Sequence, residues 1–253
     1  MIYDIQKASA LKRLSALILD FILLLVFATG AAYASSLIFD IDTHQENLQN
    51  KYEYYETTYN VSFDLTQEDF ENMSEEEYNH YLEVEEMINN DEEFIKEYQL
   101  VINLTLVILF VGFLIGTLIV EFIVPIIFKN GQTIGKKVFS LVVVKNNSVK
   151  ISNVQLFVRT IFGKFIIETI IPTYFITMAM YGIMGIIGPV LVIALAILQI
   201  ALIIFTKNNT PIHDIIAYTC VADKETQMIF DDEKALLDYK NKIHTEAVLR
   251  SKD

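Results

Sequence analysis

An aspartate inside the first apolar segment is the strongest constraint on the fold of this chain. Leu14 to Phe39 is an apolar run, long enough to cross about 30 Å of hydrocarbon. Arg13 precedes the run, and Asp20 follows Arg13 by seven positions, which is about 10 Å along a helix. In a bilayer, a carboxylate at that depth costs about 2.5–3.5 kcal/mol unless a partner meets it. The sequence therefore predicts a membrane helix whose aspartate needs a polar partner from elsewhere in the chain.

A secretory signal peptide is the competing interpretation of this segment. Basic residues precede it, and Ala32-Tyr33-Ala34 is similar to a small-residue cleavage site. However, the run is longer than a normal signal-peptide core, and Asp20 interrupts it. We therefore favour a transmembrane helix within residues 1–39.

Charge is distributed very unevenly along the chain. The 253 residues carry a formal net charge of −13, although 53% of them are hydrophobic. Residues 40–97 hold 19 Asp and Glu against 2 Lys, a net charge of −17, so the remainder carries +4. Cys220 is the single cysteine, which excludes a disulfide framework and a cysteine-based metal site.

Residues 40–98 are predicted to form a small acidic helical insertion. Thr66-x-x-Asp69 and Ser74-x-x-Glu77 are typical of helix N-termini with a capping box. The charges are consistent with a solvated acidic surface, or with a docking face or weak divalent-cation binder.

The rest of the chain is predicted to alternate between apolar helices and basic segments. Gly182, Gly185, Gly188 and Pro189 interrupt an apolar stretch that is too long for one crossing, so it folds into two helices. The predicted segments are a second transmembrane helix at 99–128, a basic β-hairpin and amphipathic helix at 129–160, two transmembrane helices at 161–206, and a polar segment with a charged tail at 207–253.

The predicted hairpin pairs a strand at 138–144 with a return strand at 149–151 across the turn Asn146-Asn147. A third strand at 215–221 is a further possibility. With four crossings, the lysines and arginines outside the acidic block all fall on one side, and the positive-inside rule places that side in the cytoplasm. Both termini are then cytoplasmic and the acidic insertion is extracellular.

All four predicted membrane helices carry a polar residue at a similar depth, about 10 Å from the cytoplasmic face by helix rise. These residues are Asp20, Glu121, Glu168 and Gln199. Like charges that lie close together in a low dielectric cannot all stay ionised, so the carboxylates need cations or protons. The groups expected to reach them are Arg13, Arg159, Lys164 and His213. This polar plane is either a charge-paired anchor for helix packing or a site for a proton or cation.

The segment Gly131-Gln132-Thr133-Ile134-Gly135-Lys136-Lys137 does not have the spacing of a Walker phosphate loop. It instead predicts a tight turn in which the glycines permit positive φ, with the lysines on anionic lipid headgroups. No nucleophile–base or metalloprotease pattern is present in the sequence. We therefore expect no enzyme activity, no catalytic or metal-binding residues, no cofactor and no nucleic-acid partner.

Together these residues resemble the RDD family of small bacterial membrane proteins, which is named for one arginine and two aspartates. The similar elements are Arg13 with Asp20, the loop Gly131 to Lys137 with the following Val142-Val143-Val144, Gln155-x-x-x-Arg159, and His213-Asp214. The resemblance leaves out the acidic insertion and the tail.

The resemblance implies an all-α polytopic protein of the bacterial cytoplasmic membrane, with about four transmembrane helices. Roles suggested within the family are monovalent cation/proton antiport and regulation of membrane proteases or stress responses. Our leading hypothesis is therefore transport or binding of Na⁺, K⁺, Li⁺ or protons, in which Asp20 and Asp214 carry the ion. Glu121 and Glu168 would support them, and Arg13 and Arg159 would tune their titration. The alternative is a non-catalytic regulator or scaffold that binds a membrane-protein partner, and a homodimer is expected for a transporter with so few helices.

Overall fold

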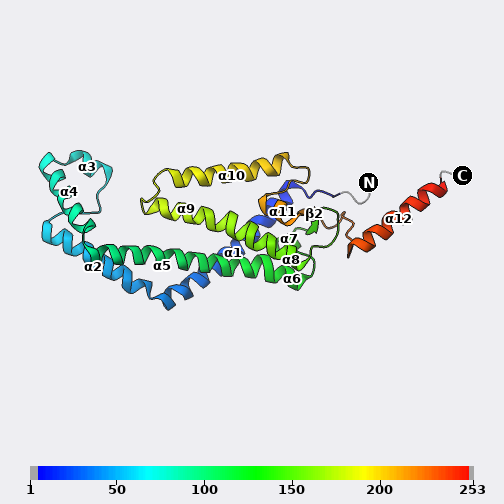
Figure 1. The fold of residues 1–253 in the computed structure, drawn as a ribbon, viewed down its shortest axis with the longest axis horizontal. Helices are drawn as coiled ribbons and strands as arrows, with labels where there is room; N and C mark the ends of the chain where they lie inside the picture. Colours follow the sequence, from blue (N-terminus) through cyan, green and yellow to red (C-terminus); the bar gives the residue numbers. More distant parts are fainter. Residues whose placement is uncertain (1–4, 251–253) are drawn as a thin grey trace. The chain divides into compact units, whose positions relative to one another are not determined.

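The computed structural model describes residues 5–250, so the first four residues of the predicted lead and the last three of the tail lie outside the described residues. The described chain is mostly helical, with one small sheet (Figure 1). It divides into two compact units. One unit combines the chain up to Ala31 with the chain from Phe110 onward, and the other is Ala32–Leu109. The acidic insertion therefore lies wholly within a unit of its own.

Within residues 5–250, three helices are long and apolar enough to cross a membrane. They are α1 (Ala10–Phe39), α10 (Ile187–Phe205), and a continuous helix made of α5 (Glu92–Thr117), η1 (Leu118–Ile123) and α6 (Val124–Phe128). In α1, the first turn is capped by Ser9, whose Oγ accepts the Lys12 N–H at 3.2 Å. Only 6% of the apolar window of α10 is buried within the protein, so its side chains require lipid around them.

The remaining predicted crossing, the third in chain order, lies in one uninterrupted helical run of three segments, α8 (Asn153–Phe157), η2 (Val158–Ile170) and α9 (Ile171–Met180). The predicted boundary between an amphipathic helix and a membrane helix at residue 161 therefore does not correspond to a break. After a turn, α10 packs along α9 (Figure 1). That α8 to α9 crosses the membrane remains a prediction.

Each of the two π-helical segments, η1 and η2, precedes a proline. Pro125 and Pro172 each stand two residues beyond the end of a π segment. Proline has no N–H and clashes with the carbonyl four residues earlier, so the helix cannot close its normal ladder there. The carbonyls at those positions belong to Glu121 and Glu168. The Glu121 carbonyl instead accepts a hydrogen bond from Thr160 Oγ1 at 2.9 Å.

The predicted hairpin is wrong in its pairing. Strand β1 (Leu141–Lys145) pairs antiparallel with β2 (Thr219–Asp223), which lies in the region of the possible third strand. The expected return strand at 149–151 contributes only isolated bridges, between Val144 and Lys150 and between Val149 and Phe230. The segment immediately before β2 is not a strand but a short helix, α11 (Ile212–Ala217).

Both faces of this two-stranded sheet are buried, which explains its continuous run of valines. Leu141 and Val143 pack with Ala16 of α1 on one face. Val142 and Val144 pack with Cys220 on the other. The unit that contains the sheet also has two further helices. They are the short α7 (Ile134–Val138) before β1 and α12 (Glu233–Arg250) in the tail.

The acidic unit contains α2 (Ile41–Tyr59), α3 (Gln67–Asn72), α4 (Glu75–Asn89) and the start of α5. Both predicted capping boxes are confirmed, since Thr66 and Ser74 each exchange two hydrogen bonds with the acidic residue three positions on.

Aromatic and apolar side chains form the core of the acidic unit. Tyr52 makes edge contacts with both Phe63 and Phe94, and Val84 is fully buried.

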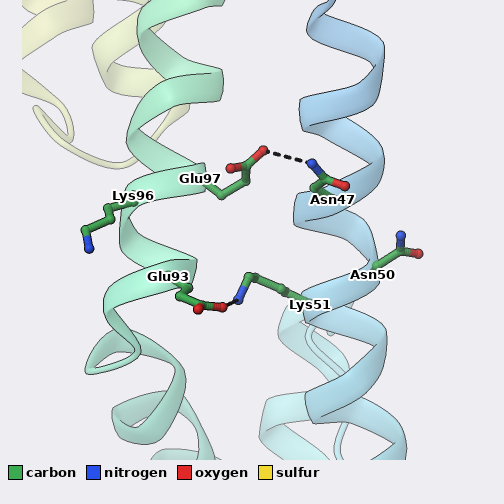
Figure 2. A pocket seen from close by; sticks show the side chains of 6 residues that line it. All are labelled: Asn47, Asn50, Lys51, Glu93, Lys96 and Glu97. Carbon is green, nitrogen blue, oxygen red and sulfur yellow. Dashed lines mark hydrogen bonds and ion pairs between the residues drawn. The ribbon is translucent and has the colours of Figure 1, made fainter.

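Charged and amide side chains line a shallow pocket on the surface between α2 and α5. Figure 2 shows Lys51 and Asn47 of α2 facing Glu93 and Glu97 of α5, whereas Lys96 and Asn50 point away from the opposite helix. The unit therefore has its own apolar core beneath a charged surface.

Candidate functional site

The partner of Asp20 is the loop that contains Gly131 to Lys137. Asp20 is only 4% exposed. Its Oδ1 accepts the Gly135 N–H at 2.7 Å, and its Oδ2 accepts the Thr133 hydroxyl at 2.5 Å. The Lys136 ammonium lies 3.5 Å from Oδ2. A carboxylate deep in an apolar helix is thus neutralised by a main-chain donor, a hydroxyl and a cation from one loop.

The local sequence of this loop explains why it can reach Asp20. Thr133 caps α7 by accepting the Lys136 N–H at 3.2 Å. A Cβ at Gly135 would lie 2.3 Å from the Ala16 carbonyl oxygen, so only glycine lets α7 approach α1 this closely. Gly131 has φ of +68°, which confirms the expected positive φ there, but Gly135 lies within α7 without a positive φ, so that expectation is wrong for Gly135.

The remaining residues of the loop also have defined contacts. Gln132 is buried, and its Nε2 donates to the Leu141 carbonyl, which ties the loop to β1. Lys137 is exposed and lies over the Phe128 ring, 3.9 Å from its centroid. Lys136 is buried, so the prediction that both lysines lie on lipid headgroups is wrong for Lys136.

Glu121 is surrounded by cations. Lys164 Nζ donates to its Oε1. Its Oε2 lies 3.7 Å from Lys136 Nζ and 3.8 Å from Arg159 Nη1. Lys136 therefore bridges Glu121 and Asp20, which belong to two different membrane helices.

Arg159 connects Glu121 to the segment His213-Asp214. Its Nε donates to Asp214 Oδ1 at 2.7 Å, and its Nη2 lies 3.0 Å from His213 Nε2. His213 Nδ1 in turn lies 2.8 Å and 2.9 Å from the two carboxylate oxygens of Glu168. The result is a single chain of contacts that runs from Asp20 through Lys136, Glu121, Arg159 and His213 to Glu168.

Asp214 lies in α11, outside the membrane helices, and the groups around it set its pKa. Burial by itself raises this pKa, but the charges that face Asp214, Arg159 first among them, more than offset it, and the pKa of Asp214 lies well below its usual range. Burial also raises the pKa of the Cys220 thiol on β2, to about 12. Asp214 is therefore a firmly ionised partner of Arg159, and Cys220 is an unreactive thiol.

The structure brings together most residues of the predicted polar plane. Their carboxylates are linked by Lys136, Lys164, Arg159 and His213. Arg13 does not reach the plane. Its guanidinium donates to the carbonyls of Asn209 at 2.9 Å and Val221 at 2.5 Å, so it anchors α1 to the segment around α11. Gln199 lies at the edge of the site, where its Oε1 accepts the Ile212 N–H at 3.0 Å.

A model of the RDD family matches residues 7–218. The chain belongs to the RDD family. Comparisons with curated proteins and with solved structures found no match. The family resemblance of the sequence is thus confirmed, and the apolar helices identify this RDD protein as a membrane protein.

The resembling motifs of this RDD chain converge in space. Asp20 is held by the loop Gly131 to Lys137, and Asp214 is held by Arg159. Two roles could not be assigned from the sequence, namely the bridging position of Lys136 and the Thr160 hydroxyl on the Glu121 carbonyl. The sequence held a signal for the second role. Glu-x-x-x-Pro occurs at both Glu121 and Glu168, and the proline leaves the glutamate carbonyl without its normal helical donor.

Proposed function

We propose that this RDD-family protein is a non-enzymatic membrane protein that exchanges protons for monovalent cations. The observation that carries the proposal is the position of Lys136. Its ammonium lies between Asp20 on α1 and Glu121 on η1, both almost fully buried. The protein thus contains a two-carboxylate site in which a side chain supplies the monovalent cation.

The Lys136 ammonium is loosely held at this site. Its separations from Asp20 and Glu121, 3.5 Å and 3.7 Å, are long for charge-assisted hydrogen bonds, and its shorter contact is the Thr133 hydroxyl at 3.1 Å. A Na⁺, K⁺ or Li⁺ ion that displaces the ammonium would leave the local charge unchanged. In this proposal the cation meets Asp20 and Glu121, and not Asp214, because the displaceable Lys136 ammonium lies between Asp20 and Glu121, whereas Asp214 is paired with the Arg159 guanidinium at 2.7 Å.

The proposed orientation follows the positive-inside rule. The basic segments around α7, β1 and α11 face the cytoplasm of a bacterial cell, and the acidic unit faces outward. The chain of contacts from Asp20 to Glu168 then lies toward the cytoplasmic ends of the helices.

The first test is transport by the full-length protein reconstituted in liposomes, with internal pH followed after addition of Na⁺, K⁺ or Li⁺. We expect a cation-linked pH change with wild type, its loss in Asp20→Asn, and its retention in Asp42→Asn, which alters an exposed aspartate of α2. Absence of any such change with wild type would refute the transport function.

The second test uses neighbouring lysines. Lys136→Gln removes the resident ammonium, so we expect half-saturation of binding at a lower Na⁺ concentration. Lys137→Gln alters the adjacent exposed lysine and should bind like wild type. Equal affinities in the two variants would show that Lys136 does not occupy a cation site.

A second candidate function is a regulator that docks a membrane-protein partner through the acidic unit. The observation that favours it is that Ala32–Leu109 forms a compact unit of its own with mainly acidic charges. Deleting residues 44–92 tests this function in cells. If cellular function survives the deletion, the acidic unit is not the docking face.

A further inference from the structure

The hydrogen bonds around His213 determine which of its nitrogens carries the proton. Arg159 can only donate, so His213 Nε2, 3.0 Å from Arg159 Nη2, accepts and carries no hydrogen. Nδ1 therefore carries the hydrogen and donates to Glu168 at 2.8 Å and 2.9 Å. This arrangement of donors and acceptors fits an uncharged imidazole whose Nε2 lone pair is directed at the Arg159 guanidinium.

Two buried carboxylate oxygens next to this arrangement have no hydrogen-bond donor among the described residues, namely Oδ2 of Asp214 and Oε2 of Glu121. Asp214 Oδ2 lies 3.5 Å from His213 Nε2. Glu121 Oε2 lies 3.8 Å from Arg159 Nη1. A buried acceptor without a hydrogen bond lowers stability. Each of these two oxygens lies close to a group that now bonds to another residue, namely His213 to Glu168 and Arg159 to Asp214.

We propose that His213 Nε2 is the proton-binding atom of this RDD protein, and that its protonation transfers Arg159 from His213 to Glu121. A proton from the aqueous phase would bind the Nε2 lone pair, and the new N–H would donate to Asp214 Oδ2. Arg159 Nη2 would lose its acceptor and face a positive imidazolium, so the guanidinium would turn to Glu121 Oε2. Both unpaired oxygens gain a donor in the protonated state.

The proposal also agrees with the charges that face His213. Its own helix α11 contributes Asp214, η2 contributes Arg159, Glu168 and the nearby Lys164, and α10 contributes the neutral Gln199. Arg13 of α1 is bound to carbonyl oxygens.

The contacts from Asp20 to Glu168 join four carboxylates to three permanent cations. The carboxylates are those of Asp20, Glu121, Asp214 and Glu168. The three cations are Lys136, Lys164 and Arg159. With neutral His213 this set carries one net negative charge, and with protonated His213 it carries none. The His213 side chain is 12% exposed, so protons can reach it.

This inference rests on the proposed function, because Arg159 would couple the proton at His213 to the cation-binding carboxylate Glu121. Protonation would occupy Glu121 and weaken cation binding, and cation binding would favour neutral His213. That reciprocity is what an exchanger of one proton for one cation requires.

The first experiment is ¹⁵N NMR of the histidine and arginine side chains in the full-length protein in detergent, with His213→Gln used to assign the signal. We expect His213 to carry its hydrogen on Nδ1 at high pH and to gain an Nε2 proton as the pH falls. The Arg159 signals should shift with the same midpoint, and Glu121→Gln should reduce that shift. An Nε2-protonated tautomer at high pH, or Arg159 signals that do not follow His213, would overturn the proposal.

The second experiment measures the pH profile of cation-linked flux in liposomes. Wild type should follow a single-proton titration, up to about tenfold per pH unit. His213→Gln should lose this dependence, whereas His44→Gln, which alters the histidine paired with Glu97 in the acidic unit, should keep it. An unchanged profile in His213→Gln refutes the role of His213 alone. Absence of flux in wild type refutes the proposed transport, and the NMR titration still decides whether His213 moves Arg159.

Discussion

Gly135→Ala tests the contact on which the site depends, the approach of α7 to α1. A Cβ added at Gly135 would lie 2.3 Å from the Ala16 carbonyl oxygen and 2.8 Å from Asp20 Oδ1. Neither neighbour can move freely, because one is main chain of α1 and the other is held by the Gly135 N–H and the Thr133 hydroxyl. The variant must therefore separate the two helices.

The expected loss in the free energy of unfolding of Gly135→Ala has two parts. Overpacking of a well-packed site costs about 1–3 kcal/mol. Separation of the helices also weakens the hydrogen bond from the Gly135 N–H to the ionised Asp20, a type of bond that contributes about 1.5–3 kcal/mol. We therefore expect the free energy of unfolding to fall by roughly 2.5–6 kcal/mol if both are lost.

The assay is equilibrium unfolding in a detergent–denaturant titration, with Gly30→Ala as the matched control. Gly30 is in α1, and an added Cβ there meets nothing within 4 Å. Alanine is the better helix former, so Gly30→Ala should leave stability unchanged or raise it by up to about 1 kcal/mol. If the two variants differ by less than about 0.5 kcal/mol, the close approach of α7 to α1 is not a feature of the folded protein.

Three further predictions concern the sheet region and the acidic unit. The charges that face Asp214, Arg159 first among them, hold its pKa below its usual range against the effect of burial. Its contribution to stability is therefore fully present above about pH 4 and is lost as the pH falls below that value. Asp214→Asn should cost about 3–5 kcal/mol at neutral pH and flatten the acid dependence, and equal unfolding curves at neutral pH would contradict this. Cys220, whose pKa burial raises to about 12, should react with maleimide only after unfolding, as followed by mass spectrometry, and rapid labelling of folded protein would show that β2 is exposed. Thr66→Ala and Ser74→Ala should each lower the local stability of α3 and α4 by about 1 kcal/mol, measured by amide exchange, and unchanged protection would mean that these caps are not formed.

Several features of the fold and of the site could be predicted from the sequence, because they depend on local patterns. The depth of Asp20 follows from the length of its helix, and the capping boxes follow from spacings of three residues. The repeated Glu-x-x-x-Pro at Glu121 and Glu168 also had a structural meaning, since both positions lie in π-helical segments that end before a proline.

The pairing of charges could not be predicted, because it depends on contacts between distant parts of the chain. Arg13 and Asp20 are neighbours on α1, yet Arg13 binds carbonyls and Asp20 binds a loop 113 to 116 positions away. Lys136 and Lys137 are adjacent in sequence, but one is buried between two carboxylates and the other is exposed. The two lysines are chemically equivalent, and the direction in which each side chain leaves α7 decides which one meets a carboxylate. No local sequence pattern encodes that direction.

The sequence by itself determined that this RDD protein has long apolar helices with a carboxylate at depth, and that its acidic segment is separate from its basic one. These properties follow from hydrophobic length and charge, which each segment carries independently of its neighbours. Only the tertiary structure decided that β1 pairs with β2, and that Lys136, Arg159 and His213 link Asp20 to Glu168. The physical reason is that desolvated charges need partners within a few ångströms, and the partner that reaches each of them is fixed by how the helices pack.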